Sequence, residues 1–517
     1  MKTLLSIGLT AGAVGAVVAG GLAVNAFLAG GGTQPEDVLP ANTIGFVKVD
    51  LNPSTGQKVN VLRLMQKLPD VDRKGEDLKR TVVESILADS DLDLTYATDV
   101  EPWLGDRLAL AAVPSLERSS EDPVAPLAVI EFTDEEAMRV ALAKAEKKAI
   151  AGYRETHSWM DEQPAVTEAE PGTAPDSEHR GAAVDPLGPV HPDDYDPFDY
   201  AVRDGFVLIS EHQAQADRAA RSERVLADAG TYAADKDAID GTDQIVLGWL
   251  DVSAAFQAVP EGDRAEFAEA FGSARPGGRV ILGVHAEPAA VEAVGATIDL
   301  EAGGTQALAA EEPGTGIVAD LPAETDVAFS ATGLGDVAAD MWERYGEESS
   351  YSLDADAEAM GLKMPDDLVA VLGRETAVGA VLPQGRTEEF KVTARVATDS
   401  PERALKVIDK LNQMEPSEEV FTSPAPGGYT LSTDRAHLAD AADGDMSLAD
   451  DDAFSNAVPD AADASALLFV DLRAVMGIFS AMGASEEADP WEPLEAFGAT
   501  ATGQDGDGEF TMRLTFR

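Results

Sequence analysis

The 517-residue chain contains no cysteine. Disulfide bonds, thiolate metal sites, cysteine nucleophiles and a lipid-modified N-terminal cysteine are therefore excluded. Basic residues are also scarce: 38 lysines and arginines stand against 94 aspartates and glutamates, which gives a net charge of −56. Such a surface repels nucleic-acid phosphates and anionic lipid headgroups, so we expect no nucleic-acid partner.

Familiar catalytic motifs are missing as well. The chain has no Gly-x-Ser-x-Gly elbow, no Ser-x-x-Lys pair and no phosphate-binding loop. Its six histidines show no His-x-x-x-His spacing of the kind that zinc sites use. The densest group of metal-ligating residues is His191 with Asp193, Asp194 and Asp196. The sequence therefore identifies no catalytic residue and implies no cofactor. It leaves a specific metal site open, and its acidic loops allow weak binding of divalent cations.

The first 35 residues form an apolar stretch. Residues 3–34 carry no charge, Lys2 precedes them and Glu36 follows them. About 20 apolar residues are enough for a helix to span a bilayer, and the positively charged flank of such a helix stays in the cytoplasm. We therefore predict a transmembrane anchor over residues 1–35, with the remaining chain extracytoplasmic at the cell membrane. The alternative is a signal peptide cleaved near Val24-Asn25-Ala26.

The rest of the chain contains one series of segments twice. Each copy begins with a Leu-Pro-Ala motif and an apolar strand, continues with a Leu-Gly motif and another strand, and later has an apolar strand that ends in Asp. The matched segments are 39–43 with 321–325, 104–114 with 372–383, and 245–252 with 467–472. The same order of landmarks in both copies indicates a tandem duplication.

We predict an α+β fold of two tandem modules, residues 36–305 and 316–517. Alternating strands, hairpin-like turns and helices between only some strands favour a mostly antiparallel sheet with helices packed on one face. Residues 154–198 are rich in proline and acidic residues, which predicts a disordered insertion in the first module. The sequence leaves open whether the modules share one sheet or form separate lobes.

Polar residues mark several helix starts and strand ends. Thr133 and Glu136 have the spacing of a capping box, with Thr133 as N-cap. Asp50, Asp251 and Asp471 each end an apolar strand. Paired carboxylates are suited to acid–base chemistry, but Asp is also a favoured N-cap. We interpret all three aspartates as caps of the turn or helix that follows.

Two glycine-containing segments imitate ligand-binding loops. Gly333-Leu334-Gly335 follows a strand and resembles a nucleotide-binding turn, but the adjacent Asp336 would repel phosphate. Asp505-Gly506-Asp507-Gly508 begins like a calcium loop, but its spacing fails after Asp507. We interpret the first segment as a glycine turn before a helix and the second as a hairpin turn.

Several of these segments resemble one known family. The apolar N-terminal stretch, Leu39-Pro40-Ala41, the strand ending in Val49-Asp50-Leu51-Asn52-Pro53 and the segment Phe469-Val470-Asp471-Leu472 are similar to the actinobacterial domain-of-unknown-function family 3352. The resemblance implies a single-span envelope protein. It brings no catalytic residues, because the family has no assigned activity.

The sequence thus favours a non-enzymatic binding or structural protein of the cell envelope. We expect its modules to present a sheet or groove to an envelope protein or an apolar ligand, with the membrane contacted through the N-terminal helix. The alternative is an envelope hydrolase or a divalent-metal-assisted enzyme with a dispersed site. A third hypothesis is a passive acidic surface protein with no specific ligand.

Overall fold

The computed structural model describes most of the chain after the apolar stretch. The described residues are 32–67, 79, 80, 83, 84, 87, 94–116, 123–156, 197–239, 243–270, 273, 275–301, 314–345, 357, 359–383, 390–414, 420–443, 447–482, 491–504 and 507–517. Residues 1–31 of the predicted anchor and 157–196 of the predicted insertion, including the His191 group, lie outside them. Among the described residues, no helix is both long and apolar enough to cross a membrane.

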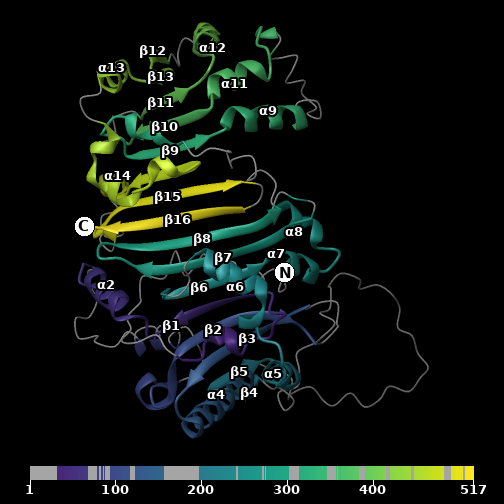
Figure 1. Ribbon diagram of the computed structural model, residues 1–517. Coiled ribbons are helices and arrows are strands. Elements are labelled where there is room, and N and C mark those ends of the chain that lie inside the picture. The colour runs from purple at the N-terminus through teal and green to yellow at the C-terminus, as the bar shows by residue number, and fades with distance from the viewer. Residues whose placement is uncertain are drawn as a thin grey trace, which may run out of the picture.

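The described residues form one continuous sheet of 16 strands, and neighbouring strands in it are antiparallel (Figure 1). The first eight strands are β1 (Gly45–Asp50), β2 (Leu104–Pro114), β3 (Val124–Phe132), β4 (Asp199–Arg203), β5 (Phe206–Ser210), β6 (Val246–Asp251), β7 (Gly277–Ala286) and β8 (Ala290–Glu301). The last eight are β9 (Val327–Thr332), β10 (Glu375–Val381), β11 (Lys391–Ala397), β12 (Phe421–Ala425), β13 (Gly428–Ser432), β14 (Ala466–Asp471), β15 (Leu494–Gln504) and β16 (Asp507–Phe516). The two predicted modules therefore share one sheet.

The helices lie between the strands along the chain. In the first half they are η1 (Pro35–Asp37), α2 (Thr55–Met65), η2 (Tyr96–Val100), α4 (Glu135–Thr156), α5 (Gln213–Ala220), η4 (Leu226–Asp228), α6 (Gly230–Ala238), α7 (Val252–Ala258) and α8 (Arg264–Ala270). In the second half they are η6 (Gly316–Asp320), α9 (Leu334–Tyr345), α11 (Asp366–Leu372), α12 (Pro401–Met414), α13 (Arg435–Asp443), η8 (Leu448–Asp450), α14 (Asp452–Ala457), η9 (Ala461–Asp463) and α15 (Leu472–Met482).

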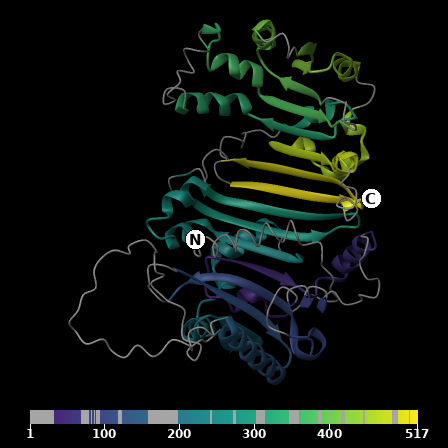
Figure 2. The same ribbon diagram turned by 180° about the vertical axis from the view of Figure 1, so that it is seen from behind.

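The strand order reads alike in both directions from the middle of the sheet. Outward from the central β8–β16 pair, one half runs β8-β7-β6-β1-β2-β3-β5-β4 and the other runs β16-β15-β14-β9-β10-β11-β13-β12. Each strand thus has a counterpart eight places later in the chain. Helix α2 follows β1, and helix α9 follows its counterpart β9. The two helices lie at opposite ends of the sheet's strands (Figures 1 and 2).

The register shows the same relation at the level of residues. Val294 of β8 pairs directly with Thr511 of β16. In the first half, Val294 also pairs with Gly283 of β7, which in turn pairs with Leu247 of β6. In the second half, Thr511 pairs with Thr500 of β15, which in turn pairs with Leu467 of β14. Leu247 and Leu467 occupy matched positions of the predicted repeat. Counterpart positions therefore face each other at the centre, as a local two-fold axis requires.

Helices cover both faces of the sheet, so the prediction of a single covered face was wrong. Neighbouring residues of a strand point to opposite faces. Leu208 of β5 lies in a core cluster with Tyr232 of α6, whereas its neighbour Val207 lies in a cluster with Met138 of α4. The strand Phe-Val-Leu-Ile-Ser is apolar at four consecutive positions, which is typical of burial on both sides.

Candidate functional site

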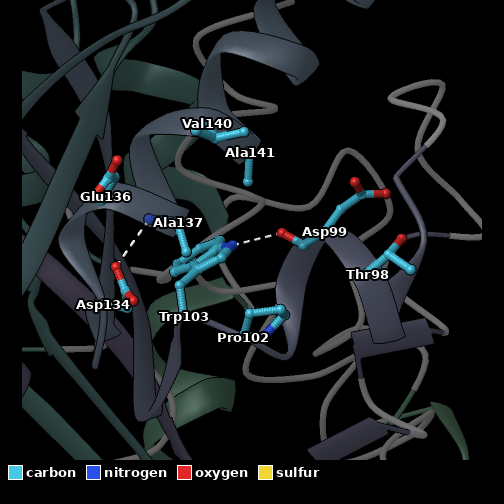
Figure 3. Close-up of a pocket in the computed structure, with 9 residues that line it drawn as sticks. All are labelled: Thr98, Asp99, Pro102, Trp103, Asp134, Glu136, Ala137, Val140 and Ala141. Atoms are coloured by element: carbon cyan, nitrogen blue, oxygen red, sulfur yellow. Dashed lines mark hydrogen bonds between the residues drawn. The ribbon is translucent and has the colours of Figure 1, made fainter.

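An open hollow of about 320 Å³ lies between the first turns of α4 and the π-helical turn η2 (Figure 3). It is lined by Thr98, Asp99, Pro102, Trp103, Asp134, Glu136, Ala137, Val140 and Ala141. Its volume is at the lower end of the range of small-molecule sites. Single π-helical turns are rare and frequently occur at functional sites, so this place in the fold is a candidate for binding.

Trp103 forms the floor of the hollow and is held in place at both ends. Its indole Nε1 donates a hydrogen bond to the Asp99 carbonyl at 2.7 Å. The Trp103 carbonyl accepts from the Thr133 amide at 2.7 Å and from the Thr133 hydroxyl at 3.1 Å. The side chain is only 5% exposed. These bonds fix the ring, and its apolar surface lies beneath the first turns of α4 (Figure 3).

The first turn of α4 forms one wall. The helix begins at Glu135, and Asp134 Oδ1 accepts the Ala137 amide at 3.0 Å. Asp134 is therefore the N-cap, and the prediction of Thr133 as N-cap was wrong by one residue because the Thr133 hydroxyl bonds to Trp103 instead. Val140 stands at the rim with 68% of its surface exposed. The wall thus combines a carboxylate with an exposed apolar side chain.

The rim carries more negative than positive charge. Asp99 accepts a hydrogen bond from Lys144 at 2.7 Å and one from the Thr95 amide at 2.8 Å. These two bonds lower the pKa of Asp99, the first having the larger effect, so the carboxylate stays ionised. The carboxylates of Asp134 and Glu136 also line the hollow. Lys144 balances only one of the three, and the site therefore attracts cations.

The floor of the hollow belongs to the first half alone. The matched motifs Leu104-Gly105 and Leu372-Gly373 place Val371 at the position that corresponds to Trp103. Val371 lies in α11, and its carbonyl accepts a hydrogen bond from Tyr429 at 2.5 Å. An aromatic surface is thus present in one half and replaced by a small aliphatic side chain in the other.

A second polar cluster lies beside the junction of the two halves. Arg513 of β16 donates to Glu292 at 2.5 Å and to Glu287 at 2.6 Å, and His285 Nε2 lies 3.2 Å from Glu292 Oε1. The hydrogen bond from His285 and the charge of Arg513 hold the pKa of Glu292 below its ordinary value, although burial opposes them. The sequence analysis does not predict this group, because His285 has no second histidine at a helical spacing. The strand spacing His-x-Glu at 285–287 was the available signal.

The three strand-ending aspartates serve as caps, as predicted. Asp251 accepts the Ala254 amide at 2.8 Å at the start of α7. Asp471 accepts the Arg473 amide at 2.8 Å at the start of α15, and Asp50 accepts the Asn52 amide at 2.7 Å in the turn after β1. The three side chains are not brought together as a catalytic pair. Asp251 follows Leu250, which pairs with Gly45 at the opposite end of β1 from Asp50.

The glycine turn at residue 333 also follows its prediction. Gly333 has a φ of +71°, a conformation that favours glycine, and α9 begins at the next residue. The Gly333 amide donates to the Arg374 carbonyl at 2.8 Å, and the Gly335 amide donates to the Gly373 carbonyl at 3.3 Å. Both amides are engaged by backbone carbonyls, so they do not serve as phosphate donors.

The predicted hairpin near the C-terminus is confirmed for its described residues. Gln504 of β15 pairs with Asp507 of β16, and the two strands are antiparallel neighbours. Asp507 Oδ1 accepts the Asp299 amide at 2.8 Å. This carboxylate therefore supports a neighbouring strand end, and the remaining residues of the calcium-like motif, 505 and 506, lie outside the described residues.

Comparison with known proteins identifies the family. A model described as "Protein of unknown function (DUF3352)" matches residues 3–424, which is most of the chain. The protein belongs to the DUF3352 family. The resemblance to this family is thereby confirmed; the Leu-Pro-Ala motif at 39–41 lies inside the matched residues, and the Phe-Val-Asp-Leu motif at 469–472 lies outside them. No curated protein and no solved structure is detectably similar to this DUF3352 chain. The family description assigns no activity.

Proposed function

We propose that this protein is a membrane-anchored, extracytoplasmic binding protein that is not an enzyme, and that it holds a small organic cation with an apolar body in the Trp103 hollow. The observation that carries the proposal is the fixed Trp103 ring beneath a rim with three carboxylates and one lysine. An aromatic face attracts cations through its quadrupole. The neighbouring carboxylates add charge attraction, and the apolar floor binds the hydrocarbon part of the ligand.

The charge of the whole molecule supports a cationic ligand. A net charge of −56 raises the local concentration of cations around the protein and lowers that of anions. The exposed Val140 offers additional apolar contact at the rim. An anionic ligand would meet repulsion from both the rim and the overall field. A neutral apolar ligand would use the floor but gain no attraction from the carboxylates.

The proposed membrane anchor rests on the uncharged residues 3–34 and on the chain that follows them. Glu36 is 2% exposed and bonded to Lys48 at 2.8 Å and Lys236 at 2.9 Å. The polypeptide therefore joins the sheet within a few residues of the apolar stretch. This short connection would hold the folded part close to the membrane surface.

We also propose that the two halves are copies of one ancestral module. The mirrored strand order and the direct Val294–Thr511 pair support this. So do the counterpart edge-to-face ring pairs, Tyr232–Trp249 and Phe454–Phe469, with centroids 5.7 Å and 5.2 Å apart. Duplication explains why Trp103 can serve binding, since the other copy keeps the same architecture with Val371 at that position.

The test is binding of benzyltrimethylammonium to the full chain in a neutral detergent, measured by calorimetry, with benzyl alcohol as the uncharged counterpart. We expect the cation to bind at one site, and benzyl alcohol to bind at least tenfold more weakly. Glu136→Lys should weaken binding of the cation by a similar factor. Glu146→Lys makes the same charge change at an exposed position of the same helix outside the hollow, and this variant should bind the cation as wild type does. Equal affinities for the two variants would refute the site.

A further inference from the structure

We propose that His285, Glu287 and Glu292 form a three-ligand site for a divalent transition-metal ion such as Zn²⁺, beside the junction of the two halves. One nitrogen of the histidine and one oxygen of each glutamate lie within 4.8 Å of one another. Imidazole and carboxylate are both established zinc ligands, and three protein ligands with an open fourth position are a common arrangement. The proposal is independent of the Trp103 hollow.

The spacing of the donor atoms fits such an ion. Ligand atoms bound about 2.0–2.1 Å from a tetrahedral Zn²⁺ lie about 3.3 Å from each other. The Nε2 atom of His285 and the Oε1 atom of Glu292 are 3.2 Å apart. Glu287 follows the end of β7, and one of its carboxylate oxygens lies within 4.8 Å of the other two donor atoms. The histidine and one carboxylate are therefore already placed as two corners of the coordination shell.

Arg513 orients both carboxylates. Its Nη1 and Nη2 atoms bind the Oε2 atoms of Glu292 and Glu287. One oxygen of each carboxylate is thus fixed by the guanidinium. Glu292 Oε1 is the oxygen that faces His285. Hydrogen-bonded partners of this kind commonly orient metal ligands. Arg513 comes from β16, so the second half of the sheet positions ligands that all belong to the first half.

The charge and hydrogen bonding of the cluster leave room for an ion. Two glutamates and one arginine sum to −1 when His285 is neutral, so a divalent cation is attracted. The Nδ1 atom of His285 is buried and has no hydrogen-bond partner among the described residues. Zn²⁺ would bind Nε2 in place of the proton that this nitrogen shares with Glu292, and the proton of the neutral ring would then lie on Nδ1.

The test is a Zn²⁺ titration of the chelator-treated full chain in the presence of excess Ca²⁺, which fills weak carboxylate sites. We expect one tightly bound Zn²⁺ per chain. Co²⁺ should show the visible absorption of a four- or five-coordinate ion. His285→Gln should bind at least tenfold more weakly and lose the Co²⁺ bands. His212→Gln is the matched control, because His212 is exposed and outside the cluster, and it should behave as wild type does.

Unfolding curves of each variant without metal separate loss of ligand from loss of fold. Glu287→Gln, at a partly exposed side chain, provides a second variant if His285→Gln does not fold. The proposal fails if the wild-type protein does not bind one Zn²⁺ ion tightly per chain. It also fails if folded His285→Gln or Glu287→Gln binds Zn²⁺ as strongly as wild type.

Discussion

Glu36 and Lys48 form a buried ion pair, with Lys48 Nζ 2.8 Å from Glu36 Oε1 and the two side chains 2% and 9% exposed. Lys236 donates to the same carboxylate at 2.9 Å, and the Tyr232 hydroxyl donates at 3.1 Å. The carboxylate therefore connects η1, β1 and α6 at the point where the chain enters the fold. Val318 and Ser330 occupy the counterpart positions in the second half, so this ion cluster is a feature of the first half.

Replacing Glu36 with Gln should strongly destabilise the protein. The two lysines would lose the carboxylate that neutralises them, and removing one partner of a buried pair costs about 3–5 kcal/mol. Urea unfolding followed by circular dichroism measures the loss. Glu135→Gln removes an exposed carboxylate that bonds Arg139 on the surface of α4, and it should leave the midpoint almost unchanged. Equal midpoints for the two variants would contradict a stabilising role for Glu36.

The stability difference between wild type and Glu36→Gln should shrink in acid. Burial alone would raise the pKa of Glu36, but Lys48 and Lys236 more than offset it and lower the pKa to about 2. Its ordinary value is 4.5, so the contribution is complete above that pH and is lost as the pH falls toward 2. This lowering of the pKa corresponds to a contribution of about 3 kcal/mol to the free energy of unfolding. Unfolding curves between about pH 7 and pH 3 test this, and a difference independent of pH would contradict it.

The first module alone, residues 36–305, should form a dimer. Without β16, the backbone of β8 becomes an unpaired edge, which favours pairing with another strand. Because counterpart positions pair at Val294–Thr511, β8 of a second copy can replace β16 in the same antiparallel register. Light scattering after size exclusion should give twice the monomer mass. Val294→Lys would set two like charges opposite each other at the axis and should yield monomers, whereas a monomeric unmodified module would argue against the two-fold relation.

Gly498→Ala should destabilise the second half. A Cβ at position 498 of β15 would overlap the Ala457 carbonyl oxygen of α14, because that helix lies directly on the glycine. Overpacking of this kind costs about 1–3 kcal/mol. Gly230→Ala, at the first residue of α6, meets no atom within 4 Å and serves as the control. Thermal unfolding should show a lower midpoint for Gly498→Ala only; unchanged midpoints in both would mean that α14 can shift away from the sheet.

Some features of the candidate sites could be read from the sequence and some could not. The capping roles of Asp251 and Asp471 depend on residues two or three positions away, so local pattern was enough. The Trp103 hollow depends on α4 packing beside η2, more than 30 residues apart in the chain. The His285 cluster also requires Arg513, which is 221 positions from Glu292. Composition and spacing carry no information on such encounters.

The sequence by itself determined a mostly antiparallel α+β architecture, the absence of thiol chemistry, the acidic charge and the family. These features follow from residue types and from periodicities over a few residues, where backbone geometry and capping dominate. Only the tertiary structure decided that the halves share one sheet, that both faces are covered, and that counterpart residues Val294 and Thr511 meet. Those outcomes depend on which strand edges pair across long stretches of chain, because backbone hydrogen bonds at an edge are the same for every partner and side-chain packing selects among them.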